Sequence, residues 1–294
     1  DLLWMGAAAG EPACVVTVLR NNLRYGNYEI LENDYGISLR SLVAFADRTY
    51  TPGEAISPLI KAVNVLLFKL EGQIIARHPE FDMEGRLLLD KMDLEAGTIE
   101  LEDGTWPLVT RDFPTVDAAH PYELTCEERE IVDKLVAEFR ASDHLRRHVN
   151  LLYSNGSMYL ASNGNLLFHG CVPMNEDGTF SAMNCMGTWK SGRDYLDFCD
   201  SIARRAWRDG DQEALDWMWY LWIGFKSPAS GRLVKTFERA YIEDKSTWSE
   251  PMDPYFTLTR EEGPCDAIMR EFGLYAGGHI INGHTPVKTV QGEQ

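Results

Sequence analysis

Two short apolar segments that end in histidine and glycine constrain the fold of this chain more than any other feature. Residues 165–171 read NLLFHGC, and residues 280–286 read IINGHTP. Each apolar run has the length of a buried strand, so an imidazole is expected at the carboxyl end of each strand. Open α/β sheets bind their ligands at that end. The pattern therefore predicts an α/β fold whose sheet brings His169 and His284 to one site.

A metal ion is the ligand that two such histidines suggest. Histidine is the commonest metal ligand among side chains, and a neighbouring glycine lets backbone, metal and substrate approach closely. The alternative is that each histidine is a hydrogen-bonded core residue, which is the more frequent role of a single histidine behind an apolar strand. The repeated design makes a metal as good an interpretation as a core role, but two ligands fall short of the three that a hydrolytic metal site needs.

Charge excludes several classes of partner. The 294 residues carry a formal net charge of −17, with a sequence pI near 4.8. Such a surface repels nucleic-acid backbones and anionic membranes. No apolar run approaches the roughly 20 residues that span a bilayer. Neither nucleic acid nor membrane is an expected partner, and a phosphorylated substrate would need bound cations in the site.

Cysteine usage and absent motifs narrow the chemistry further. The six cysteines, at positions 14, 126, 171, 185, 199 and 265, include no C-x-x-C pair, which indicates reduced thiols and a cytoplasmic location. The chain lacks the G-x-G-x-x-G, Walker, H-E-x-x-H and G-x-S-x-G motifs, so dinucleotide, nucleotide, zinc-protease and serine-hydrolase sites are not expected. Metal-assisted phosphoryl transfer remains.

Local patterns predict the order of the elements. A capping-box signature at Thr125 and Glu128 begins an amphipathic helix that extends to Val149. Strands over 157–161 and 165–168 form a hairpin around the turn 162–164. A second hairpin is expected, with strands at 98–101 and 106–109 around the turn 102–105. The sequence also predicts helices at 191–207, 212–222 and 261–272, and a strand at 279–282.

Several longer motifs occur in order along the chain. They are residues 1–7 (DLLWMGA), 68–73 (FKLEGQ), 77–81 (RHPEF), 156–160 (GSMYL), 191–193 (SGR), 236–239 (TFER) and 242–245 (IEDK). With these motifs and the two histidine motifs, the chain resembles the class III, Firmicutes-type fructose-1,6-bisphosphatases of the calcineurin-like metallophosphoesterase superfamily over nearly its whole length.

This resemblance implies a fold and a domain organisation. The fold would be α/β, a partial calcineurin-like metallophosphoesterase sandwich with helical elaborations. Residues 1–294 would form a single, incomplete catalytic domain. Within it, 1–80 would be mainly helical, 81–124 a small β elaboration, and 125–294 the α/β part that carries both histidine motifs.

The resemblance also implies roles for three residues. Metallophosphoesterases use five motifs for a two-metal site, and this sequence holds the last two, so His169 and His284 would bind the same one of two Mn²⁺ ions. Asp1 matches the acidic residue that closes the third motif, at the edge of the catalytic centre. The first two motifs and the rest of the third are missing. We therefore expect the chain to be inactive alone. Because it also begins directly in apolar sequence and stops just after a strand-like segment, we expect truncation at both ends.

The implied activity is the hydrolysis of the 1-phosphate of fructose 1,6-bisphosphate to fructose 6-phosphate and phosphate, by a two-metal mechanism, in gluconeogenesis. The expected partner is a small sugar bisphosphate, and a homo-oligomer is left open. The alternatives are another calcineurin-like phosphatase, acting on phosphoproteins or nucleotides, and a catalytically inert fragment. The second phosphate would need basic residues, for which the candidates are Arg193, Lys226, Arg232, Lys235 and Arg239. Ordinary surface charge is the more frequent role of each such residue.

Overall fold

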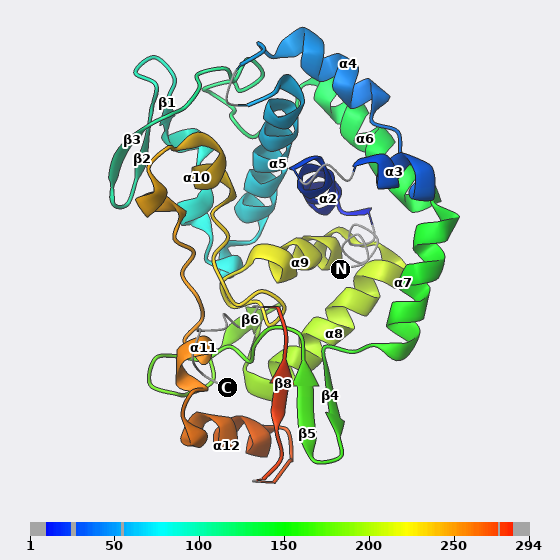
Figure 1. The fold of residues 1–294 in the computed structure, drawn as a ribbon, viewed down its shortest axis with the longest axis vertical. Helices are drawn as coiled ribbons and strands as arrows, with labels where there is room; N and C mark the ends of the chain where they lie inside the picture. Colours follow the sequence, from blue (N-terminus) through cyan, green and yellow to red (C-terminus); the bar gives the residue numbers. More distant parts are fainter. Residues whose placement is uncertain (1–9, 25–27, 54–55, 276, 285–294) are drawn as a thin grey trace, which may run out of the picture. The chain divides into compact units, whose positions relative to one another are not determined.

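The chain forms a mixed α/β protein that divides into two compact units (Figure 1). The computed structural model describes residues 10–24, 28–53, 56–275 and 277–284. Unit 1 comprises Asp1–Asn155, Ala203–Trp219 and Lys235–Ser249, and unit 2 comprises Gly156–Ile202, Tyr220–Val234 and Glu250–Gln294. The units are therefore interleaved along the sequence. The predicted division of one domain at residues 80 and 124 stays a prediction.

The elements follow one another along the chain as follows. The α-helices are α2 (Pro12–Arg24), α3 (Tyr28–Tyr35), α4 (Arg40–Thr49), α5 (Pro58–Arg77), α6 (Cys126–Ala141), α7 (Asp143–Asn155), α8 (Gly192–Asp209), α9 (Gln212–Ile223), α10 (Thr236–Tyr241), α11 (Tyr255–Leu258) and α12 (Glu262–Glu271). The strands are β1 (Met92–Asp93), β2 (Thr98–Leu101), β3 (Gly104–Pro107), β4 (Tyr159–Ser162), β5 (Asn165–Phe168), β6 (Met183–Cys185), β7 (Thr188–Lys190) and β8 (Ile280–Asn282). Short 3-10 turns occur at Pro79–Phe81, Glu84–Arg86, Leu89–Lys91 and Lys245–Trp248. No helix among these described residues is long and apolar enough to cross a membrane.

Helix α5 is the buried centre of unit 1. It begins where the Ser57 side chain accepts a hydrogen bond from the Ile60 N–H, and Pro58 fits the first helical position. Most of its residues are buried, and α2 and α4 pack against it. Lys69 lies in its middle and forms an ion pair of 2.7 Å with Glu128 of α6, with both side chains fully buried. A buried ion pair tolerates the loss of neither partner, because the remaining charge would be left unpaired.

The capping box predicted for α6 is confirmed. Thr125 accepts from the Glu128 N–H at 3.2 Å, and Glu128 accepts from the Thr125 N–H at 2.8 Å. The helix does not run to Val149 as predicted. Ser142 has an extended backbone, and its hydroxyl accepts from the Leu145 N–H, so it ends α6 and begins α7.

The antiparallel hairpin β2–β3 of unit 1 is also confirmed, with a shift in its second strand. Leu101 pairs with Gly104, so the turn is the two residues Glu102 and Asp103 rather than the four predicted. The second strand therefore begins at Gly104. Strand β1 extends this sheet by pairing with β2.

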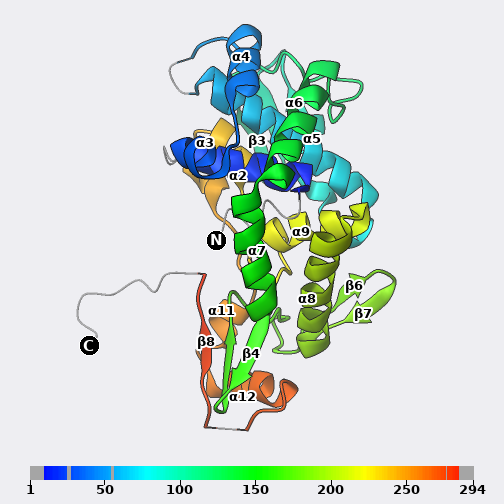
Figure 2. The same ribbon diagram turned by 90° about the vertical axis from the view of Figure 1, so that its right-hand side faces the viewer.

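Unit 2 contains the sheet β4–β5–β8 (Figure 2). Strands β4 and β5 form the predicted antiparallel hairpin, and Asn163 and Gly164 at its turn both have positive φ, as a type I′ turn requires. Strand β8 pairs with β5 in parallel. The hairpin β6–β7 completes the unit; the sequence analysis did not predict it.

The two faces of this sheet differ. Leu166 and Phe168 of β5 are buried in a core with residues of α8, α11 and α12. Leu160, Leu167 and Ile281 form a cross-strand row on the other face, because Leu160 pairs with Leu167 and Leu167 pairs with Ile281. Leu160 and Ile281 are 56% and 51% exposed. One face of the sheet is therefore covered by helices, and the other presents apolar side chains.

Candidate metal centre

The parallel pairing of β5 and β8 brings the two histidine motifs together. Phe168 pairs with Asn282, and the next step of the ladder is a hydrogen bond of 2.9 Å from the Gly283 N–H to the His169 carbonyl. The Asn282 side chain adds a bond of 3.0 Å to the Gly170 carbonyl. Two strand ends that lie 115 residues apart in sequence thus become neighbours.

The imidazoles converge at this edge of the sheet. His169 Nε2 and His284 Nδ1 are 2.9 Å apart, and the ring planes are inclined by 76°. Two nitrogens that bind the same ion, each at about 2.0–2.1 Å and with a right angle at the ion, lie roughly 3 Å apart. The pair therefore fits two ligand positions on a single divalent cation. Without a cation, one ring must donate an N–H hydrogen bond to the other, because two nitrogen lone pairs that face each other would repel.

The protonation state of the pair suits metal binding. Burial, with Arg232 and His169 as further causes, lowers the pKa of His284 to about 4. Burial also lowers the pKa of His169 below its usual value. Both rings are accordingly neutral near pH 7, which is the form that binds metal ions. The second nitrogen of His284, Nε2, is buried and has no hydrogen-bond partner among the residues that the structure describes.

Gly170 allows a loop of unit 2 to approach the strand end closely. A Cβ atom at this position would lie 2.5 Å from the Pro228 carbonyl oxygen and 2.9 Å from that of Ala229. The Cys171 N–H donates to the Pro228 oxygen at 2.9 Å. The close backbone approach that the sequence suggested for glycine is thus present at Gly170. Gly283 differs, since its Cβ would make an ordinary contact of 3.7 Å.

The described residues supply only part of a ligand set. In the part of the chain that the structure describes, no group of three or more His, Cys, Asp or Glu side chains could hold a metal ion. Asp1, the third residue predicted to lie at the site, falls outside the described residues. The two histidines are therefore a pair of ligands that needs completion.

Arg232 is the basic candidate that the structure places at the histidine pair. Its positive charge contributes to the low pKa of His284. It forms a loose ion pair of 3.5 Å with Glu250, and within the described part of the chain its buried Nε atom has no hydrogen-bond partner. A guanidinium held in this way retains donors for an anion.

The other basic candidates have partners elsewhere. In unit 2, Arg193 Nε donates to the Tyr159 hydroxyl at 3.0 Å, and Lys226 interacts with the charge of Asp253. Lys235 and Arg239 belong to unit 1, where Lys235 pairs with Glu238 at 3.2 Å and Arg239 donates to the Trp248 carbonyl at 3.3 Å.

Asp253 was not among the predicted residues, but it fixes the segment that follows His169. Its carboxylate is almost fully buried and accepts from the N–H groups of Met174 and Tyr255, at 3.0 and 2.9 Å. Burial raises its pKa to about 6. The signal in the sequence is the Asp-Pro pair before α11, since an aspartate often accepts from the N–H two residues later.

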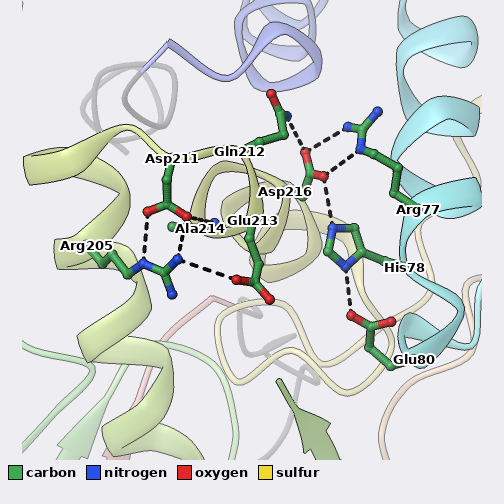
Figure 3. A network of polar contacts seen from close by, with 9 residues as sticks. All are labelled: Arg77, His78, Glu80, Arg205, Asp211, Gln212, Glu213, Ala214 and Asp216. Carbon is green, nitrogen blue, oxygen red and sulfur yellow. Dashed lines mark hydrogen bonds and ion pairs between the residues drawn. The ribbon is translucent and has the colours of Figure 1, made fainter. Parts of the chain in front are cut away.

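A second polar cluster lies in unit 1, in the 77–81 motif (Figure 3). His78 contacts Asp216 at 2.9 Å and Glu80 at 2.7 Å, and the Arg77 guanidinium binds Asp216 through two bonds of 2.9 Å. Burial alone would raise the pKa of Asp216, but hydrogen bonds from His78 and Arg77 outweigh it and hold this pKa below its usual value. Both ring nitrogens of His78 and both carboxylate oxygens of Asp216 are bonded, so these two side chains join the end of α5 to α9.

The comparison with known families decides which family this is. The model of the Firmicute fructose-1,6-bisphosphatases matches residues 1–294, the whole chain. The chain belongs to this family. As a Firmicute fructose-1,6-bisphosphatase family member, it aligns over its full length with curated relatives at 43–46% identity.

Three relatives illustrate the similarity of this family member. It is 44% identical to the fructose-1,6-bisphosphatase class 3 1 of Clostridium beijerinckii, over 100% of this chain and 48% of the relative. The corresponding protein of Clostridium novyi is 46% identical, with the same coverage, and that of Listeria innocua is 44% identical, with 49% of the relative covered. The chain thus spans about half the length of the curated relatives that it matches. No solved structure matches it.

Proposed function

We propose that the chain is part of a fructose-1,6-bisphosphatase that removes the 1-phosphate of fructose 1,6-bisphosphate in gluconeogenesis. The observation that carries the proposal is the convergence of His169 and His284 at 2.9 Å in a chain that matches this family over its whole length. Reduced thiols support a cytoplasmic location, because all six cysteines are free.

In this proposal His169 and His284 hold one Mn²⁺ ion together with ligands from outside the described residues. When bound, the metal centre polarises the phosphoryl group and makes a nucleophile available at neutral pH. The hydrogen bond from Gly283 to the His169 carbonyl keeps the two rings in register. Arg232 binds phosphate oxygens through its guanidinium, which would give its buried Nε a partner.

The sheet β4–β5–β8 is, in the same proposal, one layer of a calcineurin-like sandwich. Its histidines follow the carboxyl ends of two parallel strands, and helices cover one of its faces. The apolar row of Leu160, Leu167 and Ile281 supports a second layer on the other face, because a large exposed apolar surface usually has a partner.

The proposal is tested by replacing each histidine with alanine in the protein expressed at the length of its relatives. His169→Ala and His284→Ala should each lose one bound Mn²⁺, measured by elemental analysis after gel filtration. Loss of a group that hydrogen-bonds to a metal ligand typically lowers activity by roughly 10–100-fold. Loss of the ligand itself should lower phosphate release from fructose 1,6-bisphosphate by more than that. His120→Ala is the control, since His120 is an exposed histidine of unit 1.

Two results would contradict the proposal. Unchanged Mn²⁺ content in both variants would exclude the histidines as ligands. Faster hydrolysis of a nucleotide or a phosphopeptide than of fructose 1,6-bisphosphate, by the unsubstituted protein, would reassign the substrate while leaving the metal site in place.

A further inference from the structure

A cavity of about 430 Å³ lies in unit 1 where the ends of α6, α7 and α8 meet. Its volume falls within the range of roughly 300–1,000 Å³ that small-molecule sites occupy. Its lining belongs entirely to unit 1 and includes neither His169 nor His284. The cavity is therefore independent of the candidate metal centre.

Three arginines from three helices line this cavity. Arg140 comes from the last turn of α6, Arg146 from the start of α7 and Arg208 from the last turn of α8. The carboxylate of Asp209 is also part of the lining. Three arginines and one aspartate give the lining an excess of positive residues, in a chain whose net charge is −17. The lining attracts anions locally, although the whole chain repels them.

The ion pairs of two of these arginines, Arg146 and Arg208, leave them able to bind a ligand. Arg146 pairs with Asp143, and Arg208 pairs with Asp209. The side chains of both pairs are largely exposed, and exposed ion pairs contribute little to stability, so their cations can turn to another anion at small cost. Arg140 donates to the Gly10 carbonyl at 3.4 Å, among other interactions. A phosphate group, with several acceptor oxygens, can accept from more than one guanidinium at once.

The remaining lining combines a neutral donor with apolar surface. The Trp207 indole N–H donates to the side-chain oxygen of Asn150 at 2.8 Å. This bond fixes which end of the Asn150 amide is the acceptor and leaves its NH₂ group as a donor. Trp207, Leu145 and Phe139 supply apolar surface to the same cavity.

We propose that this cavity is a second ligand site, which binds a phosphorylated small molecule. The phosphate lies against Arg140, Arg146 and Arg208, and the carbon skeleton lies against Trp207 and Leu145. Bidentate contact between guanidinium and phosphate gives the affinity, and the apolar wall makes an organic phosphate a better ligand than inorganic phosphate.

The test uses phenyl phosphate as the probe and the 294-residue chain as the protein, titrated by calorimetry at low ionic strength. Phenyl phosphate should bind saturably, at or below about 1 mM, and roughly threefold or more tightly than inorganic phosphate, because of the apolar wall. Benzoate, which carries a carboxylate on the same ring, should bind more weakly than phenyl phosphate.

The decisive variant is Asn150→Asp. A carboxylate can still accept from the Trp207 N–H, so the local structure is retained, but it places a negative charge in the cavity wall. Affinity for phenyl phosphate should fall by about tenfold or more, since like charges repel strongly at contact distance. Asn155→Asp is the matched control: it makes the same change at the end of the same helix, outside the cavity, and should alter affinity by no more than about twofold, because a charge outside the cavity acts on the ligand across water, where Coulomb interactions are weak.

Other outcomes would overturn the proposal. These are no saturable binding by the unsubstituted chain, equal losses in Asn150→Asp and Asn155→Asp, and benzoate binding as tight as that of phenyl phosphate. A His169→Ala chain should bind the probe as the unsubstituted chain does. Loss of binding in that variant would place the probe at the histidine pair instead and would also refute the second site.

Discussion

Individual residues at the histidine pair show what a sequence can and cannot predict. The pairing of His169 with His284 was predictable, because both end short apolar strands and parallel strands present their carboxyl ends together. The choice of Arg232 among five basic candidates was not. Lys235 lies three residues from Arg232 in the sequence but belongs to the other unit, and nothing in the local pattern marks that change.

Gly170 gives a prediction at the scale of one residue. Gly170→Ala should lower the free energy of unfolding by about 1–3 kcal/mol, because the new Cβ would overlap two backbone oxygens that cannot turn aside. Urea denaturation measures the change. Gly283→Ala is the control: its φ is not positive and its Cβ would make an ordinary contact, so its effect should stay below about 1 kcal/mol. Equal effects in the two variants would show that the Gly170 contact is not tight.

The elements were predictable where their signals are local. The capping box of α6 and the Asn-Gly turn between β4 and β5 are each encoded within four residues. The break at Ser142 was missed because Leu145 and Val149 continue the apolar pattern beyond it. The β6–β7 hairpin was missed because its turn uses Met186 at a φ of 55°, and methionine is not a residue that indicates such a turn.

Helix α6 provides the prediction at the scale of an element. Thr125→Ala should reduce the free energy of unfolding by about 1 kcal/mol, since the Glu128 N–H loses its acceptor at the start of the helix. Thr125→Ser keeps the oxygen and should restore most of that stability. If the serine variant is as unstable as the alanine variant, the methyl group of Thr125 and not the cap accounts for the loss. Thermal denaturation followed by circular dichroism separates the two.

Unit 1 as a whole contains buried acids that link its stability to pH. The pKa of Glu71 is raised from 4.5 to about 7, mainly by burial and further by the charge of Glu238. A hydrogen bond from Trp219 and the charges of Arg86 and Arg20 act in the opposite direction but are outweighed. Burial likewise raises the pKa of Glu11 to about 8. The folded state therefore holds protons that the unfolded state releases above about pH 4.5.

The resulting prediction concerns the pH dependence of folding. The free energy of unfolding should fall as pH rises from 4.5 through about 7, because the unfolded chain ionises first, and the Glu71 contribution should level off above that pKa. Glu71→Gln keeps an acceptor for Trp219 and should flatten this part of the curve, measured by urea denaturation at several pH values. Glu130→Gln, an exposed position on α6, should leave the curve unchanged. A Glu71→Gln curve as steep as the original would mean that Glu71 is already ionised in the folded protein.

The interleaving of the two units also has a consequence for synthesis. The ribosome makes His169 well before β8, and 115 residues separate it from His284. At about 5–20 residues per second, roughly 6–23 s pass between the two. During that interval the nascent chain has one imidazole of the pair and no strand to align the other. The growing polypeptide therefore cannot capture a cation between these two side chains until nearly all of this sequence has been translated.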